Sequence, residues 1–401
     1  MGKIPELYNK KDNCCGCSAC YSICPKDAIS MVADEEGFLY PRIDRDICIG
    51  CRKCISVCQL KMDQQDKVNA DVNDSKCSND CYFETTTYAV RIKDKEILER
   101  SSSGGAFTAI SNWVLDNDGA IICSSYNYSK HTMEFRLITT PEERELAYGS
   151  KYVQSEPKDI FEVACSWLKN NPSKWCMFIG TGCQSAGFSK YIERNGREYR
   201  KRVVIVDIIC HGVPSPLIWR EYIGLLTQNK RTVGYVSFKD KRRGWKKPTA
   251  IAVIDGKEVS LKPYVKIFYR NEMIRPSCYK CPYASVERDH VDITIGDYWG
   301  VEKTYPDFYS KMGNSLLIVH SQTGANIFES IKENIEYKQC SVKECLQPNL
   351  CSSTDMPINR QQIWDEYFKY GIAWLVKKYG TESFIEKLKH KVILLLPLPF
   401  V

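Results

Sequence analysis

Eight of the cysteines in the first 58 residues repeat one spacing twice, and this repeat constrains the fold of its segment more than any other feature. The first run is Cys14-x2-Cys17-x2-Cys20-x3-Cys24, and the second is Cys48-x2-Cys51-x2-Cys54-x3-Cys58. Three closely spaced thiolates can ligate three irons of a 4Fe-4S cubane, while the fourth cysteine ligates the other cluster. The repeat therefore predicts two 4Fe-4S clusters, one on Cys14, Cys17, Cys20 and Cys58 and the other on Cys48, Cys51, Cys54 and Cys24.

Composition agrees with a metal-binding role for these cysteines. The chain holds 21 cysteines in 401 residues, whereas disulfide scaffolds are short secreted chains. Neither disulfides nor zinc require the repeated spacing. Since no signal peptide precedes the first run and thiolate clusters need a reducing compartment, we expect a cytoplasmic protein, from an anaerobe.

Charge and hydropathy limit the partners. The longest strongly apolar run, 392–401, contains two prolines and is too short to cross a bilayer, so no membrane span is expected. The net charge of +7 is modest and spread along the chain. It favours acidic partners such as a ferredoxin or a polyanionic coenzyme over nucleic acid.

The pattern changes twice along the chain. Residues 1–62 are expected to form a small two-cluster ferredoxin-like domain with a metal-built core, and 63–85 a polar linker. Residues 1–75 are therefore expected to be removable without unfolding the rest. Residues 86–350 are expected to form a larger α/β or α+β domain with a mixed sheet, and 351–401 a helical tail. Apolar runs predict strands at 119–126, 175–180, 202–210, 233–239, 249–254, 291–297 and 315–320. Helical periodicity appears at 105–116, 157–169, 215–227, 324–335 and 363–389.

Two motifs place a cysteine at the carboxyl end of an apolar strand, the edge at which open α/β sheets bind ligands. Gly180-Thr181-Gly182-Cys183 follows one run, and Ile209-Cys210-His211-Gly212 follows another. A third motif, Cys278-x2-Cys281, can supply two more thiolates. Four cysteines suffice for a third metal site, either a further 4Fe-4S cluster or a zinc ion. Beside two predicted clusters, we favour the cluster.

Two further motifs are of the kind that contacts a cofactor. Ser101–Gly105 (SSSGG) precedes a predicted helix, and its free N–H groups suit a phosphate or a flavin edge, although an ordinary helix cap has the same sequence. Asp292–Gly300 (DITIGDYWG) ends a strand in a Gly-Asp-aromatic turn that could lie beside a planar ring. Alone, this second motif is equally typical of a tight turn.

Several single residues keep two interpretations. His211 is a candidate to move a proton or donate to a cluster sulfur, or it is a structural histidine bonded to the backbone. The basic segment Lys239–Lys247 could meet an acidic coenzyme or protein, or form a solvated hairpin. Cys77 and Cys81 could supplement a cluster or be plain linker thiols, and the latter is favoured because no further ligand lies nearby. Cys340, Cys345 and Cys351 lack regular ligand spacing and are expected to be structural.

Six segments, taken together, resemble one known family: SSSGGAFTAI, GSKYVQS, GTGCQSAG, IICHGVPSP, FKDKRRGWKKP and CYKCPYA with DITIGDYWG. In this order they are similar to the coenzyme F-420 hydrogenase/dehydrogenase beta-subunit family, over residues 85–350. The resemblance implies an iron–sulfur flavoprotein oxidoreductase that binds FAD. It implies a third cluster on Cys183, Cys210, Cys278 and Cys281, and a flavin near Ser103, Gly104, Gly105, Lys151, Gly296 and Asp297.

The expected function is an electron relay that ends at a flavin, since a flavin can join one-electron clusters to a two-electron acceptor. The expected partners are a ferredoxin or another redox protein, a small-molecule acceptor, and further subunits or copies of the chain. Members of the family differ in substrate, so the acceptor stays open between an F-420-type deazaflavin and another small molecule. Alternatives are a non-catalytic electron-transfer subunit, a surface-polysaccharide-pathway reductase, and a thiol or nitro-group reductase using Cys123 or Cys176, although both cysteines lie in apolar runs that favour burial.

Overall fold

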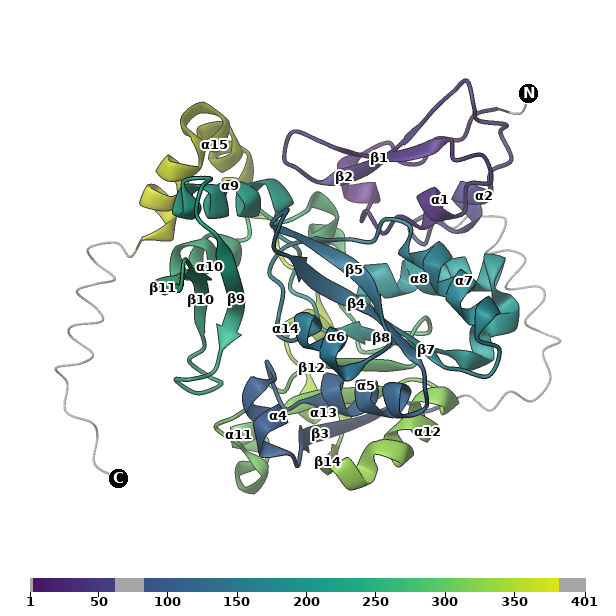
Figure 1. Cartoon of the computed structure of the whole chain (residues 1–401), viewed down its shortest axis with the longest axis vertical. Coiled ribbons are helices and arrows are strands. Elements are labelled where there is room, and N and C mark those ends of the chain that lie inside the picture. The colour runs from purple at the N-terminus through teal and green to yellow at the C-terminus, as the bar shows by residue number, and fades with distance from the viewer. Residues whose placement is uncertain (1–2, 62–82, 382–401) are drawn as a thin grey trace.

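The computed structural model describes residues 3–61 and 83–381, arranged as a small N-terminal unit against a larger α/β body (Figure 1). Cys77, Cys81, the 63–82 part of the predicted linker and the apolar run 392–401 lie outside the described residues. Among the residues described, no helix is both long and apolar enough to cross a bilayer.

The N-terminal unit consists of a hairpin and two single-turn helices. Strands β1 (Ile29–Ala33) and β2 (Leu39–Ile43) pair antiparallel, and α1 (Ala19–Ser22) and α2 (Lys53–Ser56) carry the third cysteine of each run. Before each helix, the chain passes through two left-handed residues, Gly16 and Ser18 in the first run and their counterparts Gly50 and Arg52 in the second. The cysteine repeat is thus also a repeat of backbone conformation.

A nine-stranded mixed sheet forms the centre of the body, in the order β14-β3-β13-β12-β8-β7-β4-β5-β6. The four central strands, β12, β8, β7 and β4, run parallel, and their carboxyl ends meet at one edge of the sheet. The bounds are β3 (Thr86–Ile92), β4 (Ala120–Asn127), β5 (Thr132–Ile138), β6 (Ser155–Glu156), β7 (Cys176–Thr181), β8 (Val203–Ile208), β12 (Ile293–Asp297), β13 (Ser315–Val319) and β14 (Ile335–Cys340).

Helices cover both faces of this sheet, which explains why β7 (CMFIGT) and β8 (VVIVDI) are almost continuously apolar. On one face, α5 (Ala106–Asp116) and α12 (Gln322–Ile331) pack over a core that includes Ile110, Val206 and Phe328. On the other, α7 (Ile160–Asn170) and α8 (Gly182–Asn195) pack on Phe178 and Ile205. The predicted mixed α/β architecture is confirmed.

A second, smaller core lies beside the sheet. Strands β9 (Val233–Asp240), β10 (Thr249–Ile254) and β11 (Lys257–Ser260) form a separate antiparallel sheet. Trp219 and Tyr264 pack between this sheet and helices α9 (Pro216–Thr227), α10 (Lys262–Tyr269) and α15 (Arg360–Leu375). Helix α15 starts earlier than the predicted residue 363 and is interrupted at Gly371, which has φ of 76°. Residues 382–389 of the predicted helix lie outside the described residues.

All seven predicted strands are present, and the sequence missed mainly the edges of the sheets. The strands that were not predicted are β1, β2, β3, β5, β6, β11 and β14. In the main sheet the missed strands make four pairings, of which three are antiparallel and one, between β5 and β6, is parallel. The remaining helices are short: α4 (Lys95–Arg100), α6 (Pro141–Arg144), α11 (Val301–Thr304), α13 (Val342–Cys345) and α14 (Pro348–Cys351).

The N-terminal unit is not built around its metal sites alone, and this corrects the expectation of a freely removable module. Ala19, Ile23 and Val57 belong to the same apolar cluster as Phe161 and Phe188 of α7 and α8. Removing the unit would expose that part of the cluster to water. The two units therefore stabilise each other through a shared core.

Candidate functional site

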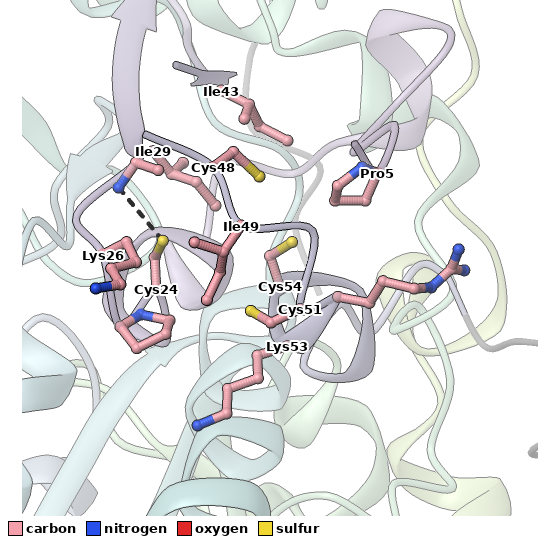
Figure 2. Close-up of a pocket in the computed structure, with 13 residues that line it drawn as sticks. Pro5, Cys24, Lys26, Ile29, Ile43, Cys48, Ile49, Cys51, Lys53 and Cys54 are labelled. Carbon is pink, nitrogen blue, oxygen red and sulfur yellow. Dashed lines mark hydrogen bonds between the residues drawn. The ribbon is translucent and has the colours of Figure 1, made fainter. Parts of the chain in front are cut away.

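The cysteines of the N-terminal unit line two separate cavities. The first, here called the outer cavity, is lined by Cys24, Cys48, Cys51 and Cys54 together with residues that all lie between Pro5 and Cys54. Figure 2 shows the four sulfurs around this cavity, with Ile29, Ile43 and Ile49 beside them. The Ala28 N–H donates to Cys24 Sγ at 3.3 Å. Cys51 itself is exposed at the surface of the protein.

The second, the inner cavity, is lined by Cys14, Cys17, Cys20 and Cys58, along with Cys15, Leu7 and Met31. The two cavities thus divide the eight cysteines into the same two groups of four that the spacing pairs. Burial raises the pKa of the Cys20 thiol well above its ordinary value, and the neighbouring thiols Cys17, Cys14 and Cys58 raise it further. Buried thiols that crowd one another in this way are suited to share a cation or a cluster.

A third group of four thiols, the third cysteine group, converges at the carboxyl edge of the main sheet. Cys183 lies in the first turn of α8 after β7, Cys210 follows β8, and Cys278 and Cys281 lie in and just after the 3-10 helix Pro276–Lys280. Burial raises the pKa of Cys210 well above its ordinary value, followed by the effects of Cys278, Cys183 and Cys281. Burial, then Cys183, raises the pKa of Cys278 to about 12.

The arrangement of the cysteines bears on the kind of metal they suit. Within residues 3–61 and 83–381, no three His, Cys, Asp or Glu side chains come close enough together to hold a single ion. A cubane takes one cysteine on each of four irons and therefore needs a wider arrangement than one ion does.

The inner cavity adjoins the third cysteine group. A Cβ at Gly187 of α8 would lie 2.8 Å from Cys17 Sγ, so this glycine lets the N-terminal unit approach the helix that begins near Cys183. Gln59 Nε2 donates to Cys15 Sγ at 3.1 Å and also to the Cys183 carbonyl. A hydrogen bond from Cys15 lowers the pKa of the Cys183 thiol. The outer cavity has no such contacts with the larger body in its lining.

Of the residues expected along a flavin, Ser103, Gly104 and Asp297 lie at the same carboxyl edge, near the start of β13. Ser103 Oγ donates to the Asn314 carbonyl at 2.9 Å, and the Gly104 N–H donates to Ser315 Oγ at 2.9 Å. Ser315 pairs in turn with Asp297 of β12. The loop before α5 and the end of β12 therefore lie on either side of Asn314 and Ser315.

The glycines of the SSSGG motif serve close packing. A Cβ at Gly104 would lie 2.4 Å from both the Val90 carbonyl oxygen and the Ser315 nitrogen. Gly105 is the N-cap of α5 with φ of 84°, and no side chain caps the helix. Two buried hydroxyls beside this helix start have no partner among the described residues, Ser102 Oγ and Thr108 Oγ1. An uncapped helix start with unpaired hydroxyls is suited to bind an anionic group.

Asp297 is already engaged by the basic segment. Lys239 Nζ forms an ion pair with Asp297, and Trp245 Nε1 donates to it at 3.1 Å. Trp299 stacks on Trp245 with ring centroids 5.0 Å apart, and it is 46% exposed. Gly296 packs on Ile209, the residue before Cys210. The end of β12 thus presents an aromatic surface beside the third cysteine group.

Several lysines of the predicted site residues and of the basic segment have partners within the chain. Lys151 donates to the carbonyls of Ala147, Tyr148 and Gly149, and burial lowers its pKa to about 8. Lys239 and Lys241 are buried, so the segment 239–247 is not a solvated hairpin throughout. Lys241 Nζ donates to three backbone carbonyls, those of Leu98, Ser103 and Met312. The ammonium groups of Lys151 and Lys241 thus bond to backbone carbonyls, and that of Lys239 pairs with the Asp297 carboxylate.

Among the described residues, His211 and the cysteines outside the three groups have other surroundings. His211 Nε2 bonds to the Asn271 side chain at 2.6 Å, rather than to the backbone. Cys123 and Cys176 are buried, as expected from their apolar runs. Cys340 and Cys345 are buried near Tyr298, and Cys351 is exposed.

Sequence reasoning missed the side chains that join the two units, chiefly Gln59, Gln154 and Arg275. Gln154 Nε2 donates to the Cys15 carbonyl at 3.0 Å, and Arg275 Nε donates to the Cys14 carbonyl at 2.8 Å. The contacts join residues far apart in the chain, and no local motif marks such contacts.

Comparisons with known proteins agree with this arrangement. Residues 13–62 match the model of the 4Fe-4S dicluster domain. Residues 87–160 and 173–344 match the models of the coenzyme F420 hydrogenase/dehydrogenase beta subunit, N-term and C terminus respectively. The protein is therefore an iron–sulfur protein of oxidoreductase type. The two beta-subunit models together span more than half of the chain, and the chain belongs to the coenzyme F420 hydrogenase/dehydrogenase beta-subunit family, which confirms the resemblance found in the sequence.

Two other comparisons complete the findings. A chain of the F420-reducing NiFe hydrogenase complex from Methanosarcina barkeri is 16% identical, with a TM-score of 0.44, over 73% of this chain and 94% of that chain. No curated protein matches this chain.

Proposed function

We propose that the chain is a flavin-dependent electron relay, which accepts electrons from a redox protein and delivers them to a small two-electron acceptor. The observation that carries the proposal is the placement of the inner cavity between the other two cysteine groups. Its Cys17 packs on α8, and its neighbour Cys15 meets Cys183, while the outer cavity is lined by the N-terminal unit alone. The three groups form a series that leads from the surface to the carboxyl edge of the sheet.

The donor sets fit three 4Fe-4S clusters. The outer cavity would hold one on Cys24, Cys48, Cys51 and Cys54, the inner cavity a second on Cys14, Cys17, Cys20 and Cys58, and the third cysteine group a third. An FAD would lie along the loop before α5 and the end of β12, where Ser102 and Thr108 have unpaired hydroxyls. Bound clusters would supply one-electron transfer, and bound FAD would join it to two-electron chemistry.

The protein's own residues position and shield these groups. Gln59 joins Cys15 to the Cys183 backbone and accepts from the Tyr283 hydroxyl, so it fixes the spacing of the inner cavity and the third group. Trp299, which is half-exposed and stacks on the buried Trp245, offers a planar surface at the end of β12. A small planar acceptor, such as a deazaflavin, would stack there. We place the protein in the cytoplasm, as a subunit that works with a ferredoxin or a similar partner.

The metal content tests the cluster assignment. Protein purified without oxygen should contain about twelve irons per chain, four for each cubane, and essentially no zinc. Cys210→Ser should lower the iron content by one cluster, whereas the matched change Cys351→Ser, at an exposed cysteine outside all three groups, should leave it unchanged. About eight irons with one zinc would instead make the third group a zinc site.

Flavin binding tests the other half of the proposal. Ser102→Ala with Thr108→Val removes the two unpaired hydroxyls and should weaken FAD binding, since no other hydrogen bond is lost among the described residues. The control is Thr227→Val, a buried threonine whose hydroxyl bonds the Ile223 carbonyl at 2.9 Å far from the site. Affinity measured by fluorescence titration that is equal in both variants would move the flavin elsewhere. A wild-type chain that binds no flavin would make this an electron-transfer subunit without catalysis.

A further inference from the structure

Arg275 is a buried cation at the junction between the two units. It is 1% exposed, and its guanidinium donates to the Cys14 carbonyl, to the Leu39 carbonyl at 3.0 Å and to Gln154 Oε1 at 3.0 Å. All three acceptors are neutral. Among the described residues, no carboxylate pairs with it, and the nearest titratable groups are thiols and the Tyr40 phenol. A buried charge without a counter-charge is costly, so this arginine needs a negative partner.

The thiols around Arg275 belong to two of the three cysteine groups. Arg275 Nη2 lies 3.8 Å from Cys14 Sγ, and the residues whose charge acts on it include Cys14, Cys15 and Cys278. Its position is fixed, because the guanidinium stacks 4.2 Å above the Tyr40 ring. A Cβ at Gly16 would lie 2.8 Å from Nη1, so the glycine within the first cysteine run provides the space for this charge.

The outer cavity has the same backbone but no such charge. Gly50 repeats the left-handed conformation of Gly16, and Ile49 takes the place of Cys15 and is 50% exposed. The cations that line this cavity, Lys26, Arg52 and Lys53, are exposed at the surface. Water and salt screen exposed charges, whereas a buried charge acts at nearly full strength. The two cavities therefore differ in electrostatic environment more than in ligands.

This difference in electrostatic environment affects how readily a cluster in each cavity would be reduced. Four thiolates around a cubane make an anionic group, and reduction adds one more electron. Reduction potentials of such clusters depend on net charge, on hydrogen bonds to the sulfurs and on exposure to solvent. A fixed positive charge in a low-dielectric surrounding stabilises the reduced state.

We propose that Arg275 sets the reduction potential of the cluster held in the inner cavity and raises it above that of the cluster in the outer cavity. Each transfer then oxidises the outer cluster by one electron and reduces the inner one by one electron, with no bond made and no proton moved. Electrons that arrive at the surface are thereby drawn towards the third cysteine group. The inference rests on the proposed function in one respect, that both cavities hold clusters.

Potentiometric titration of the full-length protein, followed by electron paramagnetic resonance, tests the inference. Arg275→Gln should shift the midpoint potential of one N-terminal cluster to a more negative value, by at least the 59 mV that corresponds to a tenfold change in a one-electron equilibrium. The shifted signal should be the one that Cys51→Ser leaves in place. Arg275→Lys keeps a cation but loses the stacking and the fork of donors, so it should shift the potential less than Arg275→Gln does.

A second variant keeps the test valid should Arg275→Gln fail to fold. Gln154→Glu places a carboxylate on Arg275 Nη1 without changing the size of the side chain, and it should also shift the potential to a more negative value. This variant loses the Gln154 donor to the Cys15 carbonyl as well, so its iron content is measured alongside its potential. The control is Arg360→Gln, at an arginine of the same junction that is already paired with Glu36. This control should leave both potentials unchanged.

Three results would overturn the inference. Unchanged potentials in Arg275→Gln and Gln154→Glu, with full iron content, would leave Arg275 as a structural tether only. Equal shifts of both clusters in Arg275→Gln, Arg275→Lys and Arg360→Gln would point to loosening of the junction and not to charge. A wild-type protein without cluster signals would overturn the proposed function itself, and this inference with it.

Discussion

At the scale of single residues, burial decides what the charged side chains do. Lys241 lies in a basic run that suggests a surface for an acidic partner, yet its ammonium donates to the carbonyls of Leu98, Ser103 and Met312. Burial lowers its pKa to about 8. This lysine ties the loop before α5 to the loop before β13, and so supports the proposed flavin site from behind.

Lys241→Met should therefore destabilise the protein rather than weaken the binding of an anion. Each buried carbonyl left without a donor costs about 1–3 kcal/mol, so we expect a loss of about 3 kcal/mol in the free energy of unfolding. Thermal unfolding of the two proteins measures it. The neighbouring change Arg242→Met is the control, since that side chain is exposed and pairs with Asp240 and Glu258. A melting temperature that falls equally in both variants would contradict this role.

At the scale of elements, the start of α5 is held against the sheet by glycine. Gly104 lies where a Cβ would meet the Val90 carbonyl and the Ser315 nitrogen, both at 2.4 Å, so the loop contacts strands β3 and β13 through bare backbone. The Ile92 N–H donates to the Gly104 carbonyl at 2.7 Å. This packing places the uncapped helix start beside the end of β12.

Gly104→Ala should force β3 and the loop apart. Overpacking of a core costs about 1–3 kcal/mol, and here the clash is with backbone that cannot rotate away, so we expect the upper end of that range. Gly234→Ala is the matched control, because the nearest atom to its added Cβ is the Val253 carbonyl oxygen at 4.0 Å. Denaturant unfolding that shows equal stability for both variants would mean the loop can shift without cost.

The sequence predicts those elements whose signal is local. β7 and β8 are buried on both faces, and their continuous apolar runs mark them as strands. β14 was missed because four of its six residues, between Ile335 and Cys340, are exposed and polar or aromatic. The grouping of the cysteines follows from short spacings, and the structure places them accordingly in two cavities.

The rest of the site depends on contacts between distant segments, which a single sequence does not show. Arg275 precedes Cys278 by three residues, but its charge acts on Cys14, 261 residues away. Lys239 lies in a run of charges, yet it is paired with Asp297. Whether a charged side chain is buried, and therefore which partner it binds, depends on the folded structure and not on its neighbours in the sequence.

At the scale of the whole molecule, the N-terminal unit packs against the larger body through a shared apolar cluster and hydrogen bonds. It shares an apolar cluster with α7 and α8, Arg275 and Gln154 donate to its backbone, and its own Gln59 donates to the Cys183 carbonyl. Deleting the unit would expose this surface and confuse loss of electron transfer with loss of folding. A point change in the outer cavity avoids the difficulty, because that cavity is lined by the N-terminal unit alone.

Cys51→Ser removes one thiolate from the outer cavity at an exposed position, so it should leave the fold and the flavin intact. If electrons enter through this cavity, reduction of the flavin by a ferredoxin should be lost or slowed at least tenfold. Reduction by a small dye such as reduced viologen should persist, because a dye can reach the inner groups directly. Anaerobic stopped-flow absorbance of the flavin measures both rates in Cys51→Ser and in the control Cys351→Ser. Unimpaired reduction by ferredoxin would place the donor on the larger body, and equal loss with both reductants would show that the inner groups depend on the outer one for assembly.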